Sequence, residues 1–96
     1  MFGIQENSLK IITEILGKYA KIKRRVVFGS RATAKYRDNS DVDIALFGAD
    51  ITFEEISKII GEMEESDLVY KVDIVHYESL NNKELKENID REGVEF

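Results

Sequence analysis

The spacing of apolar residues alternates between helical and extended periods along this chain, and this feature limits the possible folds more than any other. A first helix is predicted from Asn7 or Ser8 to about Ala20, with four large side chains in its buried stripe: Leu9, Ile12, Leu16 and Tyr19. Three short β-rich runs are predicted strands: 26–28, 41–47 and 69–75. A further helix is predicted over 79–92, and 93–96 is a candidate edge strand. Strands that alternate with helices predict an α/β or α+β fold, with a small sheet of three to four strands flanked by helices.

The strongest local signals mark a helix between the second and third predicted strands. Thr52 and Glu55 have the spacing of a capping box, and Ile51 and Ile56 have the spacing of a hydrophobic staple. The buried stripe of this helix is predicted to consist of five residues: Phe53, Ile56, Ile59, Ile60 and Met63. These signals predict a helix that packs one face on the sheet.

The composition is that of a small globular chain. Its 96 residues suffice for one domain, which we expect to span 1–96, and 43% of them are hydrophobic. The sequence has no cysteine, which excludes a disulfide framework and is consistent with a reducing compartment. No apolar run approaches the ~18 residues of a membrane span, and the first residues lack the features of a signal peptide. We therefore expect a cytoplasmic protein without a membrane partner.

Charge is distributed unevenly along the chain. Residues 1–40 carry nine Lys or Arg against three acidic residues, whereas residues 41–96 carry five against sixteen. The basic part is suited to phosphate, but a net charge of -5 disfavours tight binding of nucleic acid. The alternative is that solvated helix faces differ in sign by chance.

Acidic residues occur where strand composition disfavours them. Asp41, Asp43 and Asp73 all fall in otherwise apolar strand segments. The first two are two residues apart and therefore point to the same face of a strand, and Asp73 would join them if its strand lies beside theirs. Converging carboxylates repel one another, so they need cations to neutralise them. Oxygen ligands select Mg²⁺ or Mn²⁺. Two such metal ions form a clamp for displacement at phosphorus. The alternative is an ordinary solvated sheet face, which explains one aspartate better than three.

A glycine and a serine end the first predicted strand. Gly29 would let the backbone approach a ligand, and a short helix is predicted from Ser30 to Ala34. The first N–H groups and the positive dipole end of such a helix bind phosphate oxygens. Nearby positive charge comes from three residues: Arg31, Lys35 and Arg37. The alternative is a plain turn with a helix cap, because a Gly-Ser pair after a strand is weak by itself.

These residues together resemble a known signature. Gly29-Ser30, ten further residues and then Asp41-Val42-Asp43 match the GS-x10-DxD pattern of the DNA polymerase beta-type nucleotidyltransferase superfamily. The chain is most similar to the minimal nucleotidyltransferases, which are short and are commonly encoded beside a HEPN-domain protein as the antitoxin of a toxin–antitoxin pair. The similarity extends over nearly the whole chain, from the first helix through the third predicted strand, where Asp73 corresponds to the third carboxylate of the family. It implies the nucleotidyltransferase fold, with a small mixed sheet.

The resemblance implies a role for each matching residue. Two Mg²⁺ ions, or Mn²⁺, would be held by three carboxylates: Asp41, Asp43 and Asp73. Asp73 would also help to deprotonate the attacking hydroxyl. Gly29 and Ser30, with Arg31 beside them, would bind the phosphates of ATP. The chain departs from the family at Ala34, where many relatives have glycine; alanine would be strained at a positive φ, and we expect a helical conformation instead.

Other residues carry weaker signals. His76 could carry a proton near the site, but a surface position at the end of a strand is the expected one. Tyr36 could stack on a base or cover the core. Arg24 and Arg25 could steer a nucleotide or a partner, and a solvated entry to the first strand is expected instead.

We therefore expect a metal-dependent nucleotidyltransferase that moves AMP from ATP to a protein hydroxyl. The resemblance implies a tyrosine of a HEPN toxin as the acceptor, so that the chain would act as an antitoxin. No room remains for a second substrate-binding domain, so the partner would complete the cleft. The alternative is a non-catalytic antitoxin that blocks its partner sterically through the acidic surface of 41–96. Transfer to a small molecule or an RNA end is a third possibility, and an open sheet edge is compatible with a homo- or hetero-oligomer.

Overall fold

The computed structural model describes all 96 residues and contains one four-stranded sheet and three α-helices. The strand order is β3-β2-β1-β4, and the strands are β1 (Arg24–Phe28), β2 (Val42–Phe47), β3 (Val72–His76) and β4 (Val94–Glu95). β1 is antiparallel to both of its neighbours, whereas β2 and β3 are parallel. The predicted architecture of a small mixed sheet flanked by helices is confirmed.

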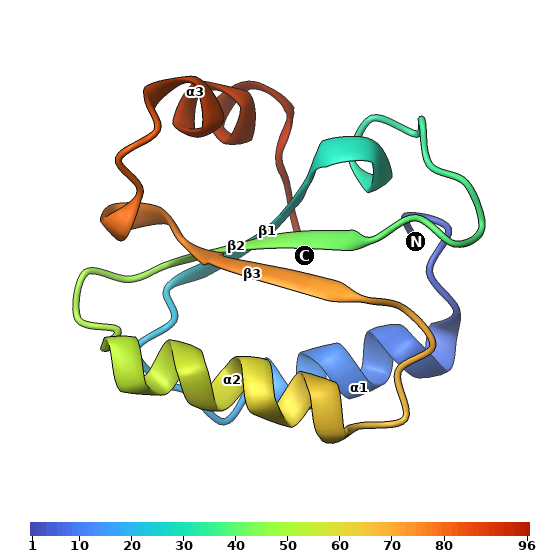
Figure 1. Cartoon of the computed structure of the whole chain (residues 1–96), viewed down its shortest axis with the longest axis horizontal. Helices are drawn as coiled ribbons and strands as arrows, with labels where there is room; N and C mark the ends of the chain where they lie inside the picture. Colours follow the sequence, from blue (N-terminus) through green and yellow to red (C-terminus); the bar gives the residue numbers. More distant parts are fainter.

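Helices cover the two faces of the sheet unequally. α1 (Glu6–Leu16) and α2 (Phe53–Glu65) lie on one face, and α3 (Lys83–Glu92) lies on the other (Figure 1). The larger core cluster lies on the α1 and α2 side and includes three fully buried residues of β2: Val42, Ile44 and Leu46. A smaller cluster lies on the α3 side: Val26, Phe28, Ala45 and Ile89. No helix is long and apolar enough to span a membrane.

The first helix is shifted from its predicted position. It begins at Glu6, after the N-cap Gln5, and ends at Leu16 with Gly17 as its C-cap, so the predicted caps at Asn7 or Ser8 and the end at Ala20 were wrong. At this start the N–H of Gln5 donates to the hydroxyl of Tyr70 at 3.0 Å, and no side chain caps the helix. Ser8, one of the predicted caps, is instead buried inside the helix.

The second helix keeps its predicted start. Both halves of the capping box between Thr52 and Glu55 are present, and Ile51 is buried as a staple requires. One residue of the predicted stripe was misplaced, because Phe53 lies on the outer side of the first turn with 84% of its surface exposed. Other boundaries also moved: β1 starts earlier than predicted, β2 starts one residue later and so leaves out Asp41, and β3 and α3 start later.

The predicted helix from Ser30 to Ala34 is only a single 3-10 turn, η1 (Gly29–Arg31), followed by a turn. Ala34 has a φ of +61°, so the expected helical conformation of this residue was wrong. The N–H of Lys35 donates to the carbonyl oxygen of Ser30 at 3.0 Å, and this closure holds Ala34 in the left-handed region. A glycine adopts that conformation without strain, which fits the glycine that the family resemblance implies at this position.

Ala34→Gly is therefore expected to raise the free energy of unfolding by about 1 kcal/mol, because it removes the left-handed strain of a residue with a Cβ. Urea denaturation measures this change. Ala32→Gly is the matched control, since Ala32 has a φ of -74° and gains nothing from glycine. A loss of stability in both variants would contradict the strained conformation of Ala34.

Candidate active site

Two of the predicted site residues lie side by side on neighbouring strands. β2 and β3 are parallel, and their register pairs Asp43 directly with Asp73. Paired residues of parallel strands share a face, with a strand separation of about 4.8 Å. Val42 and Ile44, which flank Asp43, point to the α1 and α2 side, so both carboxylates lie on the opposite face, the side of α3. The predicted convergence of these two strands is confirmed.

The carboxylate of Asp43 is in an unfavourable electrostatic environment. Its pKa is raised to about 6, chiefly by burial and next by the negative charges of Asp73 and Asp41, with a hydrogen bond to Asp73 adding to the effect. Lys71 opposes this shift, and its Nζ lies 3.8 Å from Oδ1 of Asp73. The site therefore carries more negative charge than its own cations balance.

The third carboxylate lies outside this pair. Asp41 is an exposed residue immediately before β2, and its charge acts on Asp43 without a direct pairing to β3. No three His, Cys, Asp or Glu side chains are arranged around one point as a metal-binding group. The oxygen donors and the raised pKa of Asp43 nevertheless fit a hard divalent cation, because such an ion would offset the excess negative charge.

Gly29 permits a close approach between the end of β1 and the carboxylate of Asp43. It has a φ of +69°, and a Cβ built on it would lie 2.5 Å from Oδ2 of Asp43. Phe28 pairs with Asp43 across β1 and β2, which places Gly29 and Ser30 beside the carboxylates. The backbone turn of Gly29 and Ser30 is thus adjacent to Asp43, although η1 is too short to supply the expected dipole of a helix.

Gly29→Ala is expected to lower the free energy of unfolding by about 2 kcal/mol and to reduce activity about tenfold, since alanine is strained at positive φ and displaces the Asp43 carboxylate. Gly61→Ala is the matched control. No atom lies within 4 Å of a Cβ at Gly61, and this helical position should gain about 0.5–1 kcal/mol. Denaturation curves and activity assays on both variants measure the difference, and wild-type activity in Gly29→Ala would contradict the close packing.

Arg31, a predicted phosphate ligand, is directed into the protein, with only 2% of its surface exposed. Its Nη1 donates to the carbonyl oxygens of Phe2 and Gly3, and its Nη2 donates to those of Asp38 and Ser40. The shortest of these bonds, to Ser40, is 2.9 Å long. Arg31 therefore joins the N-terminal segment to the loop before β2, and we assign it a structural role in place of the expected phosphate contact.

Two tyrosine rings complete the surroundings of Arg31. Its guanidinium carbon lies 4.7 Å from the ring centre of Tyr36 and 4.9 Å from that of Tyr70. The ring of Tyr36 also occupies the space where a Cβ of Gly3 would be. Of the two alternatives for Tyr36, the structure therefore favours covering the protein interior over stacking on a base.

His76 lies away from the carboxylates, at the last position of β3. Its side chain is 11% exposed, and its two ring nitrogens are each 2.7 Å from a partner, the carbonyl oxygen of Gly48 and the hydroxyl of Ser79. The carboxylate of Glu78 accepts a hydrogen bond from the N–H of Gly48 at 2.9 Å. His76 therefore connects loops at the far end of the sheet, which matches neither the proton carrier nor the surface position considered for it.

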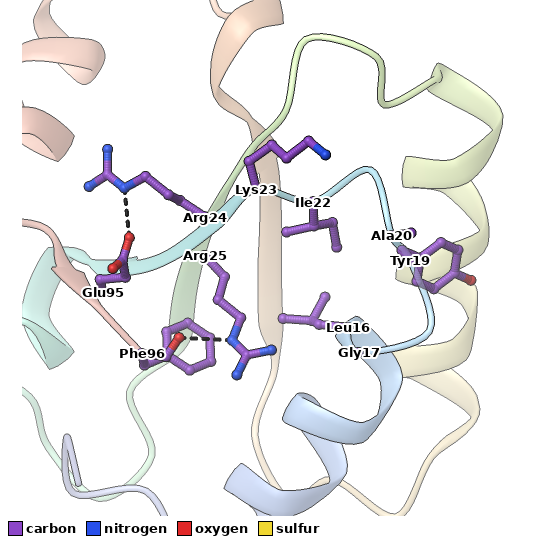
Figure 2. Close-up of a pocket in the computed structure, with 10 residues that line it drawn as sticks. All are labelled: Leu16, Gly17, Tyr19, Ala20, Ile22, Lys23, Arg24, Arg25, Glu95 and Phe96. Atoms are coloured by element: carbon purple, nitrogen blue, oxygen red, sulfur yellow. Dashed lines mark hydrogen bonds and ion pairs between the residues drawn. The ribbon is translucent and has the colours of Figure 1, made fainter.

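Arg24 and Arg25 line a cavity of about 400 Å³ at the start of β1, the end opposite Gly29 (Figure 2). Figure 2 shows Arg24 bonded to Glu95 and Arg25 bonded to the backbone of Phe96. These two hydrogen bonds are 2.7 Å and 2.8 Å long. Both arginines are thereby attached to the last residues of the chain. These contacts favour a structural role for them over steering of a nucleotide.

The surface around the carboxylates is open. Gly29, Ser30, Asp41 and Asp43 border none of the cavities of the molecule. Asp73 alone borders one, a groove of about 480 Å³ between β3 and the end of α2. A substrate bound at this surface would remain exposed to solvent on the side that this chain leaves uncovered.

Sequence reasoning missed Lys71 and Tyr70 as residues of this region. Lys71 precedes Asp73 by two positions, so the two side chains share a face of the strand, and this spacing was the available signal. The contacts of Tyr70 with Gln5 and Arg31 join parts of the chain that are distant in sequence. No local pattern indicates them.

Comparison with known proteins identifies the family. Residues 10–96 match the family described as Polymerase beta, Nucleotidyltransferase. This match covers most of the chain, so the chain belongs to the polymerase beta nucleotidyltransferase family. The comparison with curated proteins gave no significant match.

Solved structures of toxin–antitoxin complexes share the fold. One contains a tri-AMPylated Shewanella oneidensis HEPN toxin in complex with an MNT antitoxin, with a TM-score of 0.67 and 25% identity over 95% of this chain and 69% of that chain. The MntA-HepT toxin–antitoxin structure has a TM-score of 0.67 and 26% identity over the same shares, 95% and 69%. A toxin–antitoxin structure with AMP-PNP has a TM-score of 0.73 over 96% of this chain and 72% of that chain, and its 24% identity supports the fold alone. The expected nucleotidyltransferase fold is confirmed.

Proposed function

We propose that this chain transfers AMP from ATP to a hydroxyl group of a HEPN toxin and thereby acts as its antitoxin. The observation that carries the proposal is the in-register pairing of Asp43 with Asp73 beside the turn of Gly29. This pairing concentrates negative charge next to a backbone turn that can approach phosphates. Such an arrangement is suited to displacement at the α-phosphorus of a nucleoside triphosphate.

The proposed chemistry assigns each group a task. Asp41, Asp43 and Asp73 would hold Mg²⁺ or Mn²⁺, which would neutralise the charge of the phosphates and of the leaving group. Gly29 and Ser30 would position the triphosphate through the backbone turn and the serine hydroxyl. The acceptor oxygen would form a bond to the α-phosphorus while the bond from that phosphorus to the bridging oxygen breaks and pyrophosphate leaves. The carboxylate of Asp73 would take the proton of the acceptor hydroxyl.

Two independent observations support a protein acceptor. The carboxylates lie on an open surface, so a large partner can reach them and exclude water from them. A structure of similar fold and 25% identity contains an MNT antitoxin together with a tri-AMPylated HEPN toxin. A tyrosine of such a toxin is the acceptor that the sequence resemblance implies.

The proposal predicts transfer of label from α-labelled ATP, but not from γ-labelled ATP, to a HEPN toxin supplied as the acceptor. The transfer should require Mg²⁺ and should fall at least about 10²-fold in Asp41→Asn, since charge stabilisation of this kind is worth several kcal/mol. Autoradiography of the partner measures it. Labelling from γ-labelled ATP, or no labelling by the wild type, would contradict the proposal.

Steric neutralisation is the second candidate function, and the acidic surface of residues 41–96 favours it. The two candidates differ in their response to Asp41→Asn. Growth of cells that express the toxin should remain protected in the steric case, whereas protection should disappear if nucleotidyl transfer is needed.

A further inference from the structure

The outer edge of β3 is open along its whole length. β3 is the terminal strand of the sheet, and each of its residues, Val72–His76, is only partly buried. Native proteins usually protect such an edge with proline, a bulge or a covering loop. The chain contains no proline, and no segment pairs with this edge. The edge can therefore accept another strand.

The register shows which backbone groups are free. The N–H of Val42 donates to the carbonyl oxygen of Lys71 at 2.9 Å. In a parallel ladder the residues of one strand alternate in direction, so Lys71, Asp73 and Val75 direct their backbone groups toward β2. Val72 and Ile74 consequently direct their N–H and C=O groups outward. These outward groups are the hydrogen-bonding positions that an added strand would use.

A groove follows this edge and reaches the candidate active site. It has a volume of about 480 Å³, and seven of its ten lining residues are hydrophobic, among them Ile60 and Leu68. Asp73 also lines it. An extended segment seated in the groove could bury apolar side chains on one face and present a side chain to Asp73 on the other.

The order of the strands fixes the direction from which the acceptor arrives. Ser30 follows β1, Asp43 lies on the central strand β2, and Asp73 lies on β3, beyond which the sheet is open. Displacement at phosphorus needs the attacking and leaving groups on opposite sides. With the phosphates held at the β1 side, the acceptor hydroxyl must enter from the β3 side.

We propose that the acceptor protein docks an extended segment along β3 as an added strand and places its hydroxyl side chain beside Asp73. This inference rests on the proposed function and names the surface that selects the substrate. Directly opposed residues of neighbouring strands have Cβ atoms about 4.5–5.5 Å apart, which brings a side chain opposite Asp73 within reach of its carboxylate.

The charges around the groove indicate the composition of the acceptor segment that would bind there. The charged residues that line the groove are two acids, Glu64 and Asp73, against one cation, Lys71. A segment with basic residues beside its hydroxyl residue therefore fits. A second copy of this chain fits poorly, because pairing two β3 edges would bring the same acidic groups together.

The test combines hydrogen exchange with transfer kinetics, and its probe is a purified HEPN toxin. The amides of Val72 and Ile74 are expected to gain protection when that protein is added. Val72→Pro, which removes one outward N–H, is expected to raise the KM for the acceptor about tenfold, whereas Val72→Thr retains the amide and stays near wild type. Glu64→Lys on α2 should also raise this KM several-fold, with Glu87→Lys on α3 as its matched control.

Each outcome separates the docking site from the activity itself. Transfer by the wild type without protection of Val72 and Ile74, and with an unchanged KM in Val72→Pro and Glu64→Lys, would overturn the docking site and leave the proposed function intact. Protection that depends on the concentration of this chain alone would identify a second copy as the occupant and would also overturn it. If the wild type transfers no label, the proposed function fails, and protection of the β3 amides by the HEPN protein still decides whether that protein docks there.

Discussion

Replacement of Asp43 by asparagine is expected to abolish nucleotidyl transfer while making the metal-free protein more stable above pH 7. Loss of activity should reach about 10³-fold, because a neutral amide neither holds a divalent cation tightly nor balances its charge. The gain in stability arises from the raised pKa of Asp43, about 6 in the folded protein against 3.8 for an unperturbed carboxyl group. One substitution should therefore change activity and stability in opposite directions.

The direction of the pH dependence follows from that raised pKa. Because the folded state holds the proton of Asp43 more tightly than the unfolded state, the associated stabilisation is complete below about pH 4 and is lost as the pH rises through about 6. The whole difference would be worth about 3 kcal/mol, and solvent screening of this half-buried group reduces the expected gain in Asp43→Asn to about 1–2 kcal/mol at pH 8.

Urea denaturation at pH 4 and pH 8 without divalent cations measures this effect. The variant and the wild type should have similar stability at pH 4 and should differ at pH 8. Added Mg²⁺ should stabilise the wild type at pH 8 and have little effect on Asp43→Asn. A variant that is less stable than the wild type at pH 8 would show that the Asp43 carboxylate is favourably paired in the folded protein, contrary to the raised pKa.

Arg31→Met is expected to lower the free energy of unfolding by about 3–4 kcal/mol. Hydrogen bonds from a charged group contribute roughly 1.5–3 kcal/mol each, and stacking against two aromatic rings adds to them. A chain of 96 residues has a total stability of about 5–14 kcal/mol, so this loss is a large part of it. In the variant, the N-terminal segment and the loop at Ser40 should no longer be held together.

Arg31→Lys separates the structural role from a phosphate-binding role. A lysine ammonium cannot reach the separate carbonyl oxygens of Gly3 and Ser40 at once and does not stack as a planar group, so a loss of about 2 kcal/mol is still expected. Equilibrium unfolding and the affinity for a fluorescent ATP analogue should both be measured. Wild-type stability together with weakened nucleotide binding would contradict the assignment of Arg31 to the loop.

The alignment of the carboxylates could be predicted because it depends on local rules. Strand periodicity places Val42 and Ile44 on one face and Asp43 on the other, and the same rule applies to Asp73. The capping box at Thr52 was equally predictable, since both of its partners lie within one turn. The remaining condition, that β3 lies beside β2, was left open by the sequence, and the structure meets it with a parallel pairing.

The errors arose where contacts between distant parts of the chain decide local structure. At the start of α1, Tyr70 accepts a hydrogen bond from the N–H of Gln5, 65 residues away in sequence. The role of Arg31 depends on Phe2 and Gly3, and neither contact leaves a pattern near Arg31 itself. Spacing and propensity report only on neighbours in sequence, so they could not indicate these contacts.

The prediction of a helical conformation for Ala34 was wrong for a different reason. The stretch from Ser30 to Ala34 has good helical propensity, and the sequence alone favours a helix there. The structure instead ends the helical turn after Arg31 and leads the chain back toward β2. The glycine that the family resemblance implies at this position was the more informative signal, because it points directly to a positive φ.

The most direct test of the central claim is a crystal structure of the chain grown with Mn²⁺ and a non-hydrolysable ATP analogue, with the metal located by anomalous diffraction. We predict anomalous peaks bonded to Asp43 and Asp73, with Asp41 drawn into the same ligand set and the triphosphate against Gly29 and Ser30. Bound nucleotide with Mn²⁺ at any other group of residues, and with no metal between β2 and β3, would contradict the account.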